Sequence, residues 1–256
     1  MVLPFNLESF FMVFGRMTGL FLSAPVFANR QLPARIKILV IIILSAAMAY
    51  YVPVNYAVQL TSPAYFIAAL VLEIAIGYVI GFVAYVCFAA IQLAGQIMDM
   101  QMGFAIVNVV DPMSGTQIPL MGNFNNLLAL VIYLSINGHH FLIQAVVQSY
   151  QAVPGLGAHF SSDFMDLLVK ITVYMFVIAI KISAPVVIAI LTTDIAMGFV
   201  ARTVPQMNVF VVGIPLKIFM GLIALVLMLP VYIWFMGVLF EQFFGYLDEI
   251  ILALGL

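Results

Sequence analysis

The sequence predicts an all-α polytopic membrane protein built of long, kinked helical hairpins, and three observations support this fold class. Of the 256 residues, 66% are hydrophobic and 7% are charged, against about 45–50% and about 25% in ordinary soluble proteins. The few charges and the prolines divide the chain into long apolar blocks. Runs such as Ile41–Leu44 do not alternate between apolar and polar residues, as the strands of a transmembrane barrel would.

About six apolar blocks are long enough to compare with the roughly 20 residues that a helix needs to cross a bilayer. They are Ser9–Ala28, Ile36–Val52, Ala64–Ala94, Phe124–Val153, Leu167–Leu191 and Val209–Phe235, and a C-terminal amphipathic tail follows them. The third block exceeds a simple crossing, which indicates a tilted or protruding helix. The fourth is long enough for two pieces.

The distribution of basic residues predicts the orientation of the chain. Arg30, Arg35 and Lys37 crowd the first short loop, whereas residues 53–63 carry no charge and residues 154–166 carry only two aspartates. Because cytoplasmic loops are enriched in Lys and Arg, we expect this first loop in the cytoplasm and the N-terminus outside. Glu8 and the absence of a basic leader indicate that the first apolar segment is retained.

Proline and glycine positions predict how the helices bend and pack. Pro185, Pro215 and Pro230 lie in or beside later blocks, where each removes a backbone hydrogen bond and favours a kink. Two pairs of glycines spaced four apart, Gly15 with Gly19 and Gly77 with Gly81, would let helix backbones approach closely, although such spacing also arises by chance in Gly-rich segments.

Three charged residues lie inside apolar blocks: Arg16, Glu73 and Lys181. An isolated charge at the centre of a bilayer costs at least ~2.5–3.5 kcal/mol, so each needs a partner or a water-filled cavity. One interpretation is an ion or proton pathway. We favour structural pairing of Arg16 with Glu73, and of Lys181 with an acid such as Asp194 or with a partner subunit, because a relay needs a chain of titratable groups.

The sequence predicts neither an enzyme nor a cofactor or metal site, since it contains no recognisable catalytic or phosphate-binding motif. The single cysteine, Cys87, lies in an apolar run and is expected to be a small buried residue. His139 and His140 follow Asn137-Gly138, and adjacent side chains on a helix diverge, so a turn or capping role is favoured over a metal site. The net charge of −2 makes nucleic acid an unsuitable partner.

The stretch from Gln92 to Asn123 is the most informative part of the chain. Gln92, Gln96 and Asp99 share one helical face, and the glycines and prolines that follow are typical of a loop. Five methionines lie in or beside this region: Met98, Met100, Met102, Met113 and Met121. Methionine suits a compliant seal, but it is also common in ordinary helix packing, and the residues alone favour packing.

Two segments of the chain resemble the FliR family of flagellar type III export-gate proteins. They are Gly95–Phe104, followed by Asp111-Pro112, and the run Val204–Ile218, which reads VPQMNVFVVGIPLKI. Asn137–His140 and Ser149 before Pro154-Gly155 also fit the family pattern. The resemblance covers nearly the whole chain. It implies a single helical export-gate domain over residues 1–256, similar to a fusion of FliP-like and FliQ-like subunits.

The resemblance also implies a function, partners and a location. The chain would be a subunit that forms and closes the channel for flagellar proteins, in the bacterial inner membrane at the flagellar basal body. It would assemble with FliP-like and FliQ-like subunits and contact an FlhB-like subunit, unfolded export substrates and lipid. Much of such an assembly is lifted out of the bilayer plane, so we expect fewer true crossings than the hydropathy suggests. The alternatives are the equivalent subunit of a virulence injectisome and, less favoured, a secondary transporter or a membrane-embedded enzyme.

Site residues follow from matching the family motifs to this sequence. A loop that plugs the channel corresponds to about Gly103–Asn123, and deleting it is expected to raise ion leakage. The plug and its base comprise Gln96, Asp99, Gln101, Gly103, Phe104, Asp111, Pro112, Met113, Gly115, Pro119, Met121 and Gly122. A second motif, expected to form a kinked re-entrant connection at a subunit interface, comprises Pro205, Gln206, Asn208, Gly213, Pro215 and Lys217. Lys217 should face an acidic partner or backbone carbonyls, so Lys217→Glu is expected to impair assembly.

Overall fold

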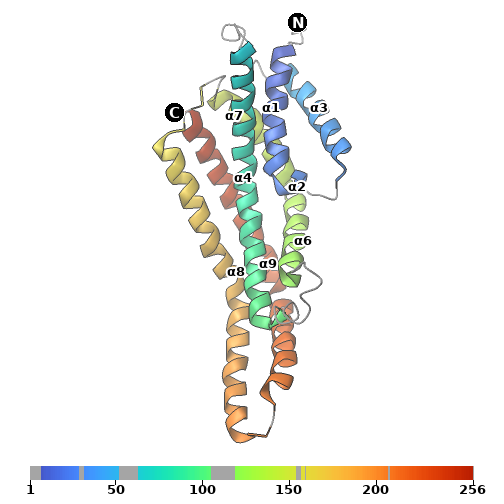
Figure 1. The fold of residues 1–256 in the computed structure, drawn as a ribbon, viewed down its shortest axis with the longest axis vertical. Coiled ribbons are helices and arrows are strands. Elements are labelled where there is room, and N and C mark those ends of the chain that lie inside the picture. The colour runs from blue at the N-terminus through green and yellow to red at the C-terminus, as the bar shows by residue number, and fades with distance from the viewer. Residues whose placement is uncertain are drawn as a thin grey trace. The chain divides into compact units, whose positions relative to one another are not determined.

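The computed structural model describes residues 7–28, 32–51, 63–104, 119–153, 157–158, 160–206 and 208–255, and every regular element in these ranges is a helix (Figure 1). The elements are α1 (Leu7–Ser23), α2 (Pro25–Ala28), α3 (Ala34–Tyr51), α4 (Pro63–Met102), α6 (Leu120–Ser135), α7 (Gly138–Ala152), α8 (Ser162–Thr203) and α9 (Val209–Gly255). The all-α prediction is confirmed. Each of the six apolar blocks corresponds to one helix or to one pair of helices.

Helix lengths differ from the predicted blocks mainly at the ends. α4, α8 and α9 contain 40, 42 and 47 residues. The C-terminal part is not a separate tail, because α9 continues through it to Gly255. In its last part the buried residues recur at helical spacing and so form one inward face: Phe240, Phe243, Leu247, Ile250 and Leu254.

Three described helices are long and apolar enough to cross a membrane, namely α4, α8 and the part of α9 from Val211 onward. α6 and α7 together pass the same test as a fourth candidate, bent by 66° at their junction. By length and composition, the described residues therefore contain three or four candidate spans, fewer than the six apolar blocks.

The sharp bend between α6 and α7 lies at Asn137, whereas helices continue past the prolines. Pro185 lies inside α8, and Pro215 and Pro230 lie inside α9. Asn137 adopts a left-handed conformation with φ of 58°, which Asn tolerates better than most residues. Gly138 follows because a Cβ there would overlap the ring of Tyr133, whose hydroxyl donates to the Gly138 carbonyl at 2.6 Å. Asn137-Gly138 thus forms the turn between α6 and α7.

Backbone contacts divide the chain into two compact units, and the first comprises the described parts of Met1–Cys87, Tyr133–Thr172 and Phe240–Leu256. In this unit the two predicted glycine pairs face each other, on α1 and on α4. A Cβ on Gly19 would overlap the Ile74 carbonyl, and one on Gly77 would overlap the Arg16 carbonyl. The prediction of close backbone approach is confirmed, and it explains how α1 packs directly on α4.

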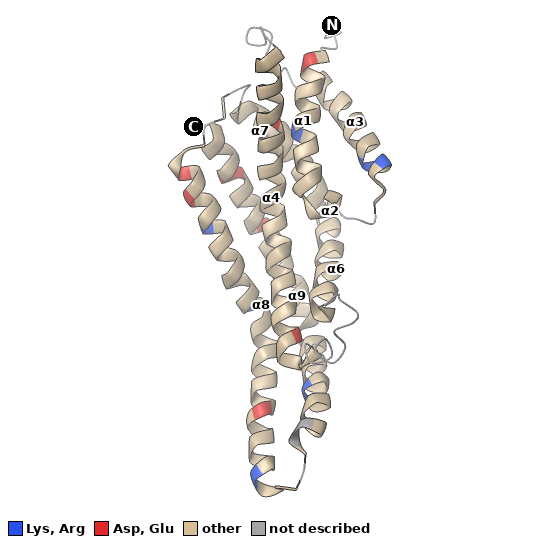
Figure 2. Ribbon diagram, viewed as in Figure 1, with Lys and Arg blue, Asp and Glu red and all other residues tan. Residues whose placement is uncertain are grey.

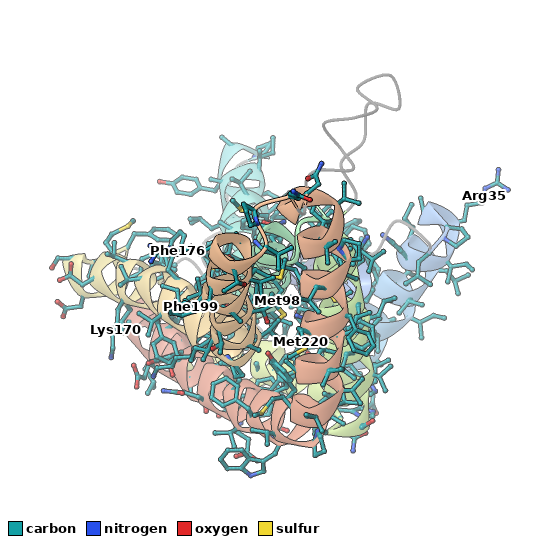
Figure 3. The ribbon with its side chains drawn as sticks, turned by 90° about the horizontal axis from the view of Figure 1, so that it is seen from below. Arg35, Met98, Lys170, Phe176, Phe199 and Met220 are labelled. Carbon is teal, nitrogen blue, oxygen red and sulfur yellow. The ribbon has the colours of Figure 1, made fainter. Side chains whose placement is uncertain are left out.

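The second unit comprises the described parts of Phe88–Ile132 and Val173–Leu239. Its longest feature is the α8–α9 hairpin, which turns at Pro205 and Gln206. Met98 lies fully buried among the helices (Figure 3). Met102 packs on Gly221, where a Cβ would lie 2.7 Å from the methionine Cε. Met98 and Met102 therefore take ordinary packing roles in this unit.

Both units expose large apolar side chains, and charges are sparse along the ribbon (Figure 2). Phe199, Leu227 and Trp234 are 65%, 71% and 68% exposed. So much exposed apolar surface on long helices must be covered by lipid or by other protein chains.

Candidate functional site

A buried ion pair joins α1 to α4 in the first unit. Arg16 Nε donates to Glu73 Oε2 at 2.6 Å and Nη2 donates to Oε1 at 3.0 Å, which is the two-pronged geometry that favours Arg with a carboxylate. The two side chains are 0% and 1% exposed. The predicted pairing of Arg16 with Glu73 is confirmed.

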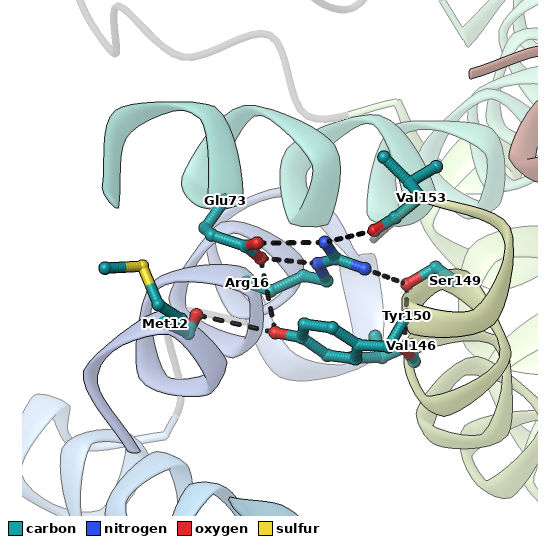
Figure 4. A network of polar contacts seen from close by, with 7 residues as sticks. All are labelled: Met12, Arg16, Glu73, Val146, Ser149, Tyr150 and Val153. Atoms are coloured by element: carbon teal, nitrogen blue, oxygen red, sulfur yellow. Dashed lines mark hydrogen bonds and ion pairs between the residues drawn. The ribbon is translucent and has the colours of Figure 1, made fainter. Parts of the chain in front are cut away.

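Residues of α7 and the residue after it complete the network around Arg16 (Figure 4). Arg16 Nη1 donates to Ser149 Oγ at 2.7 Å, and Nη2 donates to the Val153 carbonyl at 3.4 Å. The guanidinium carbon lies 3.6 Å from the centre of the Tyr150 ring, and the Tyr150 hydroxyl donates to Glu73 Oε2 at 3.2 Å. Three helices thus meet at one cation.

This network is suited to holding helices together and not to moving protons. The guanidinium group of Arg16 stays charged at all accessible pH values. Its nitrogens donate hydrogen bonds to Glu73, Ser149 and Val153. Sequence reasoning did not assign Ser149 or Tyr150 to the pair. Ser149 and Val153 are one helical turn apart and so share a face, a signal that can be read from the sequence only after α7 is known to contact Arg16.

A second buried carboxylate, Asp99 near the end of α4, holds the first turn of α6 in the second unit. Asp99 Oδ1 and Oδ2 accept from the Met121 N–H at 2.9 and 3.1 Å, and Oδ2 accepts from the Gly122 N–H at 3.2 Å. The first N–H groups of a helix have no partner within it and carry partial positive charge, so a carboxylate satisfies both needs.

Glycines allow the same two helix ends to touch. A Cβ on Gly95 would lie 2.5 Å from the Cα of Gly122. α4 ends at Met102, and the next residue, Gly103, has a φ of 87°, the left-handed conformation typical of a glycine that terminates a helix. The end of α4 and the start of α6 are therefore fastened together at the two ends of residues 105–118, which lie outside the described residues.

The other predicted plug residues are distributed as follows. Gln96 is exposed and Gln101 is half-buried, so only Asp99 of the predicted polar face becomes buried. Phe104 is half-buried, Pro119 directly precedes α6, and Met121 and Gly122 lie within its first turn, so the predicted loop range overlaps the helix. Asp111, Pro112, Met113 and Gly115 lie outside the described residues. Met121 is 4% exposed and Met100 is 72% exposed.

The described residues of the run from Pro205 to Lys217 lie in the turn of the α8–α9 hairpin and in the first turns of α9. Asn208 caps α9, because its carbonyl accepts from the Val211 N–H at 3.1 Å and its Oδ1 lies 3.4 Å from the same nitrogen. Gly213 and Pro215 lie inside α9. Lys217 Nζ lies 2.6 Å from Asp194 Oδ1 of α8. The acid that faces Lys217 thus belongs to the same chain.

Lys181 differs from the prediction in two ways. Its side chain is exposed in this chain, and Asp194 pairs with Lys217 instead. Lys181 and Asp194 lie on one continuous helix, where thirteen residues separate them by about 20 Å. A pair between them is therefore excluded by the geometry of α8.

Reversing the charge of Lys217 is expected to weaken the hairpin, and exchanging both charges should restore it. Lys217→Glu faces Asp194 with a like charge, whereas Lys217→Asp with Asp194→Lys recreates an attraction. Both side chains are about one-third exposed, 29% and 36%, so the loss of stability should not exceed ~1 kcal/mol. Thermal unfolding of the purified chain in detergent measures it, with the single variant Asp194→Lys as the other arm of the comparison. A double variant no more stable than Lys217→Glu would contradict the pairing.

The two histidines do not diverge as predicted, because their ring centres lie 4.1 Å apart. They follow the turn, where the His140 N–H donates to the Asn137 carbonyl at 2.9 Å. Across the described residues no three His, Cys, Asp or Glu side chains gather closely enough to hold a metal ion.

Comparison with known proteins places these features in a family. Residues 7–243 match the family described as bacterial export proteins, family 1. The flagellar biosynthetic protein FliR of Bacillus subtilis is 38% identical over 229 residues, covering 87% of this chain and 86% of that protein. FliR of Escherichia coli is 31% identical, with 94% and 92% covered, and FliR of Pectobacterium carotovorum is 30% identical, with 97% and 94% covered. The chain therefore belongs to bacterial export protein family 1, as a member of its FliR group.

Proposed function

We propose that this chain is a non-catalytic membrane subunit of the flagellar protein export gate. The observation that carries the proposal is the family match over residues 7–243, together with relatives that are flagellar biosynthetic proteins and align along most of their length. The candidate spans α4, α8 and α9 support a place in a membrane. The flagellar relatives favour the flagellar role over an injectisome role.

The proposed partners are FliP-like and FliQ-like subunits in one hetero-oligomer of the inner membrane, with an FlhB-like subunit beside it and unfolded proteins as cargo. Apolar residues exposed on α8 and α9 support assembly with other chains, because lipid or protein must cover them. Covering by other subunits would also let part of α8 and α9 stand outside the bilayer.

We assign the closing of the channel to residues 103–123. The contacts of Asp99 with Met121 and Gly122, and of Gly95 with Gly122, support this assignment, because they fasten both ends of the segment at one place. A segment fastened at both ends can be displaced and can return without unfolding its base. The α4–α6 contact, which includes Met121 and Gly122 at the end of the assigned range, is then the fixed base, and the residues between Gly103 and Pro119 are the part proposed to leave the channel.

Removing the segment from the assembled complex should open a leak. Residues 105–118 are replaced by a short Gly-Ser linker, which keeps Asp99 and its contacts, and the chain is produced with its co-encoded export-gate subunits. Ion conductance across the membrane is expected to rise, because the remaining linker is too small to fill the passage. Unchanged conductance in a fully assembled complex would contradict the assignment.

A Gly-Ser replacement of the same length is the matched control for the deletion. It keeps the span of chain and removes the apolar side chains, so a leak in both variants shows that the side chains close the passage. A leak in the deletion alone shows that the length of the segment closes it. Swimming of a strain that lacks its own FliR and carries this chain tests the flagellar role itself.

A further inference from the structure

A pocket of about 100 Å³ opens on the surface of the second unit between α8 and α9. Its lining is apolar apart from one lysine and one tyrosine, and comprises Lys181, Ile182, Pro185, Met228, Val231, Tyr232 and Phe235. The Tyr232 hydroxyl already donates to the Ile182 carbonyl at 2.5 Å. Lys181 is therefore the residue with a formal charge among those that line this pocket.

Lys181 is the sole charged residue in the segment of α8 between Lys170 and Asp194. At 1.5 Å per residue it lies about 16 Å from Lys170 and about 20 Å from Asp194 along the helix axis. Among the residues that the structure describes, no carboxylate lies within ion-pairing distance of Lys181. A cation in such an apolar stretch needs a partner or a water-filled cavity, and an anionic group on another chain can be that partner.

We infer that the pocket receives a carboxylate side chain, Asp or Glu, from an apolar helix of a partner subunit, and that this carboxylate pairs with Lys181. The inference rests on the proposed function and specifies one contact of the assembly. The pocket is large enough for a side chain, and the flanking exposed residues Met228 and Val231 offer an apolar surface to the helix that carries it.

The length of the apolar stretch favours a protein carboxylate over a lipid phosphate. A lipid headgroup lies at the edge of the hydrocarbon layer, and the nearer charged end of this stretch is about 16 Å from Lys181 along the helix axis. The four-carbon stem of lysine cannot extend that far. A carboxylate on a neighbouring helix can lie at the same depth as Lys181 and meet it directly.

Photo-crosslinking in the assembled complex tests the inference. A benzophenone amino acid replaces Val231 at the pocket and, as the control, Trp234, which is exposed on α9 but does not line the pocket. The chain is produced with its co-encoded membrane subunits, irradiated and analysed by mass spectrometry. The expected result is a crosslink from position 231 to a partner peptide that contains an Asp or Glu, and a different crosslinked site from position 234. A phospholipid adduct, a crosslink within this chain or to a second copy of it, or a partner peptide without an acid would overturn the inference.

Charge variants of Lys181 provide the second measurement. Lys181→Glu should lower the yield of assembled complex at least tenfold, Lys181→Arg should keep it, and Lys170→Glu on the same helix should leave it unchanged. Changing the crosslinked partner acid to Lys should rescue Lys181→Glu. Normal assembly of Lys181→Glu, or failure of the rescue, would overturn the inference. Failure of the unaltered chain to assemble with those subunits would instead contradict the proposed function, so the two failures are distinct.

Discussion

Glu73→Ala is expected to lower the free energy of unfolding by about 3–5 kcal/mol, the cost of leaving one member of a buried ion pair without its partner. Arg16 would keep Ser149 and Val153 as hydrogen-bond acceptors but would lose both carboxylate contacts, at 2.6 and 3.0 Å. Unfolding of the purified chain in detergent, followed by circular dichroism against denaturant, measures the change.

The matched control removes both charges together. Arg16→Met with Glu73→Met leaves apolar side chains of similar length, and removing both partners is far less harmful than removing one. We therefore expect the double variant to be more stable than Glu73→Ala, with a coupling energy between the sites in a mutant cycle. If the losses of stability in the two single variants simply add up to the loss in the double variant, Arg16 and Glu73 do not act as a unit. Ser149→Ala, which removes one acceptor from Arg16, should cost about 1–3 kcal/mol.

Gly77→Val is expected to lower the free energy of unfolding about as much as Glu73→Ala does. The cause here is a steric clash with backbone and not the loss of a charge. A Cβ at Gly77 would overlap the carbonyl of Arg16 on α1, so the two helices must separate. Overpacking commonly costs about 1–3 kcal/mol, and a rigid backbone neighbour places this variant at the upper end. Separation would also pull Arg16 from Glu73. The same denaturant experiment measures the loss of stability, and a wider spacing of α1 and α4 is measurable by distance labels on the two helices.

Gly245→Ala in α9 is the control for Gly77→Val. Both glycines lie in helices of the first unit, but nothing lies within 4 Å of a Cβ built on Gly245. Alanine favours the helix over glycine by about 1 kcal/mol, so this variant should be neutral or slightly stabilising. Equal destabilisation by Gly77→Val and Gly245→Ala would contradict a specific role for the α1–α4 contact.

The existence of the helices could be predicted because hydropathy is a local property. The positions of the helix ends were less predictable. In α8 and α9 polar residues extend the helix beyond the apolar block, for example at Asp194 and Gln242. A helix that leaves the apolar region keeps its backbone hydrogen bonds, so hydropathy does not mark its end. The α6–α7 bend was predictable because Asn137-Gly138 is a strong local turn signal.

The candidate site was predictable only in part. The pairing of Arg16 with Glu73 could be predicted because the apolar blocks contain few charged residues of opposite sign. The pairing of Lys217 with Asp194 could not be predicted, since the choice of acid depends on the packing of two helices across a hairpin. The capping role of Asp99 is also a tertiary effect, because its partners Met121 and Gly122 follow it by 22 and 23 residues. Single-sequence patterns do not encode such distances.

The network around Arg16 also bears on how the chain is made. Glu73 follows Arg16 by 57 residues, and Ser149 and Val153 follow it by 133 and 137. During synthesis from the N-terminus, α1 therefore emerges long before the residues that accept its guanidinium. Until α4 and α7 arrive, the guanidinium lacks the acceptors that it has in the folded chain, and a charge isolated at the bilayer centre costs at least ~2.5–3.5 kcal/mol. A nascent chain stalled before residue 73 would therefore hold this charge without Glu73, Ser149 and Val153, which distinguishes it from a finished molecule.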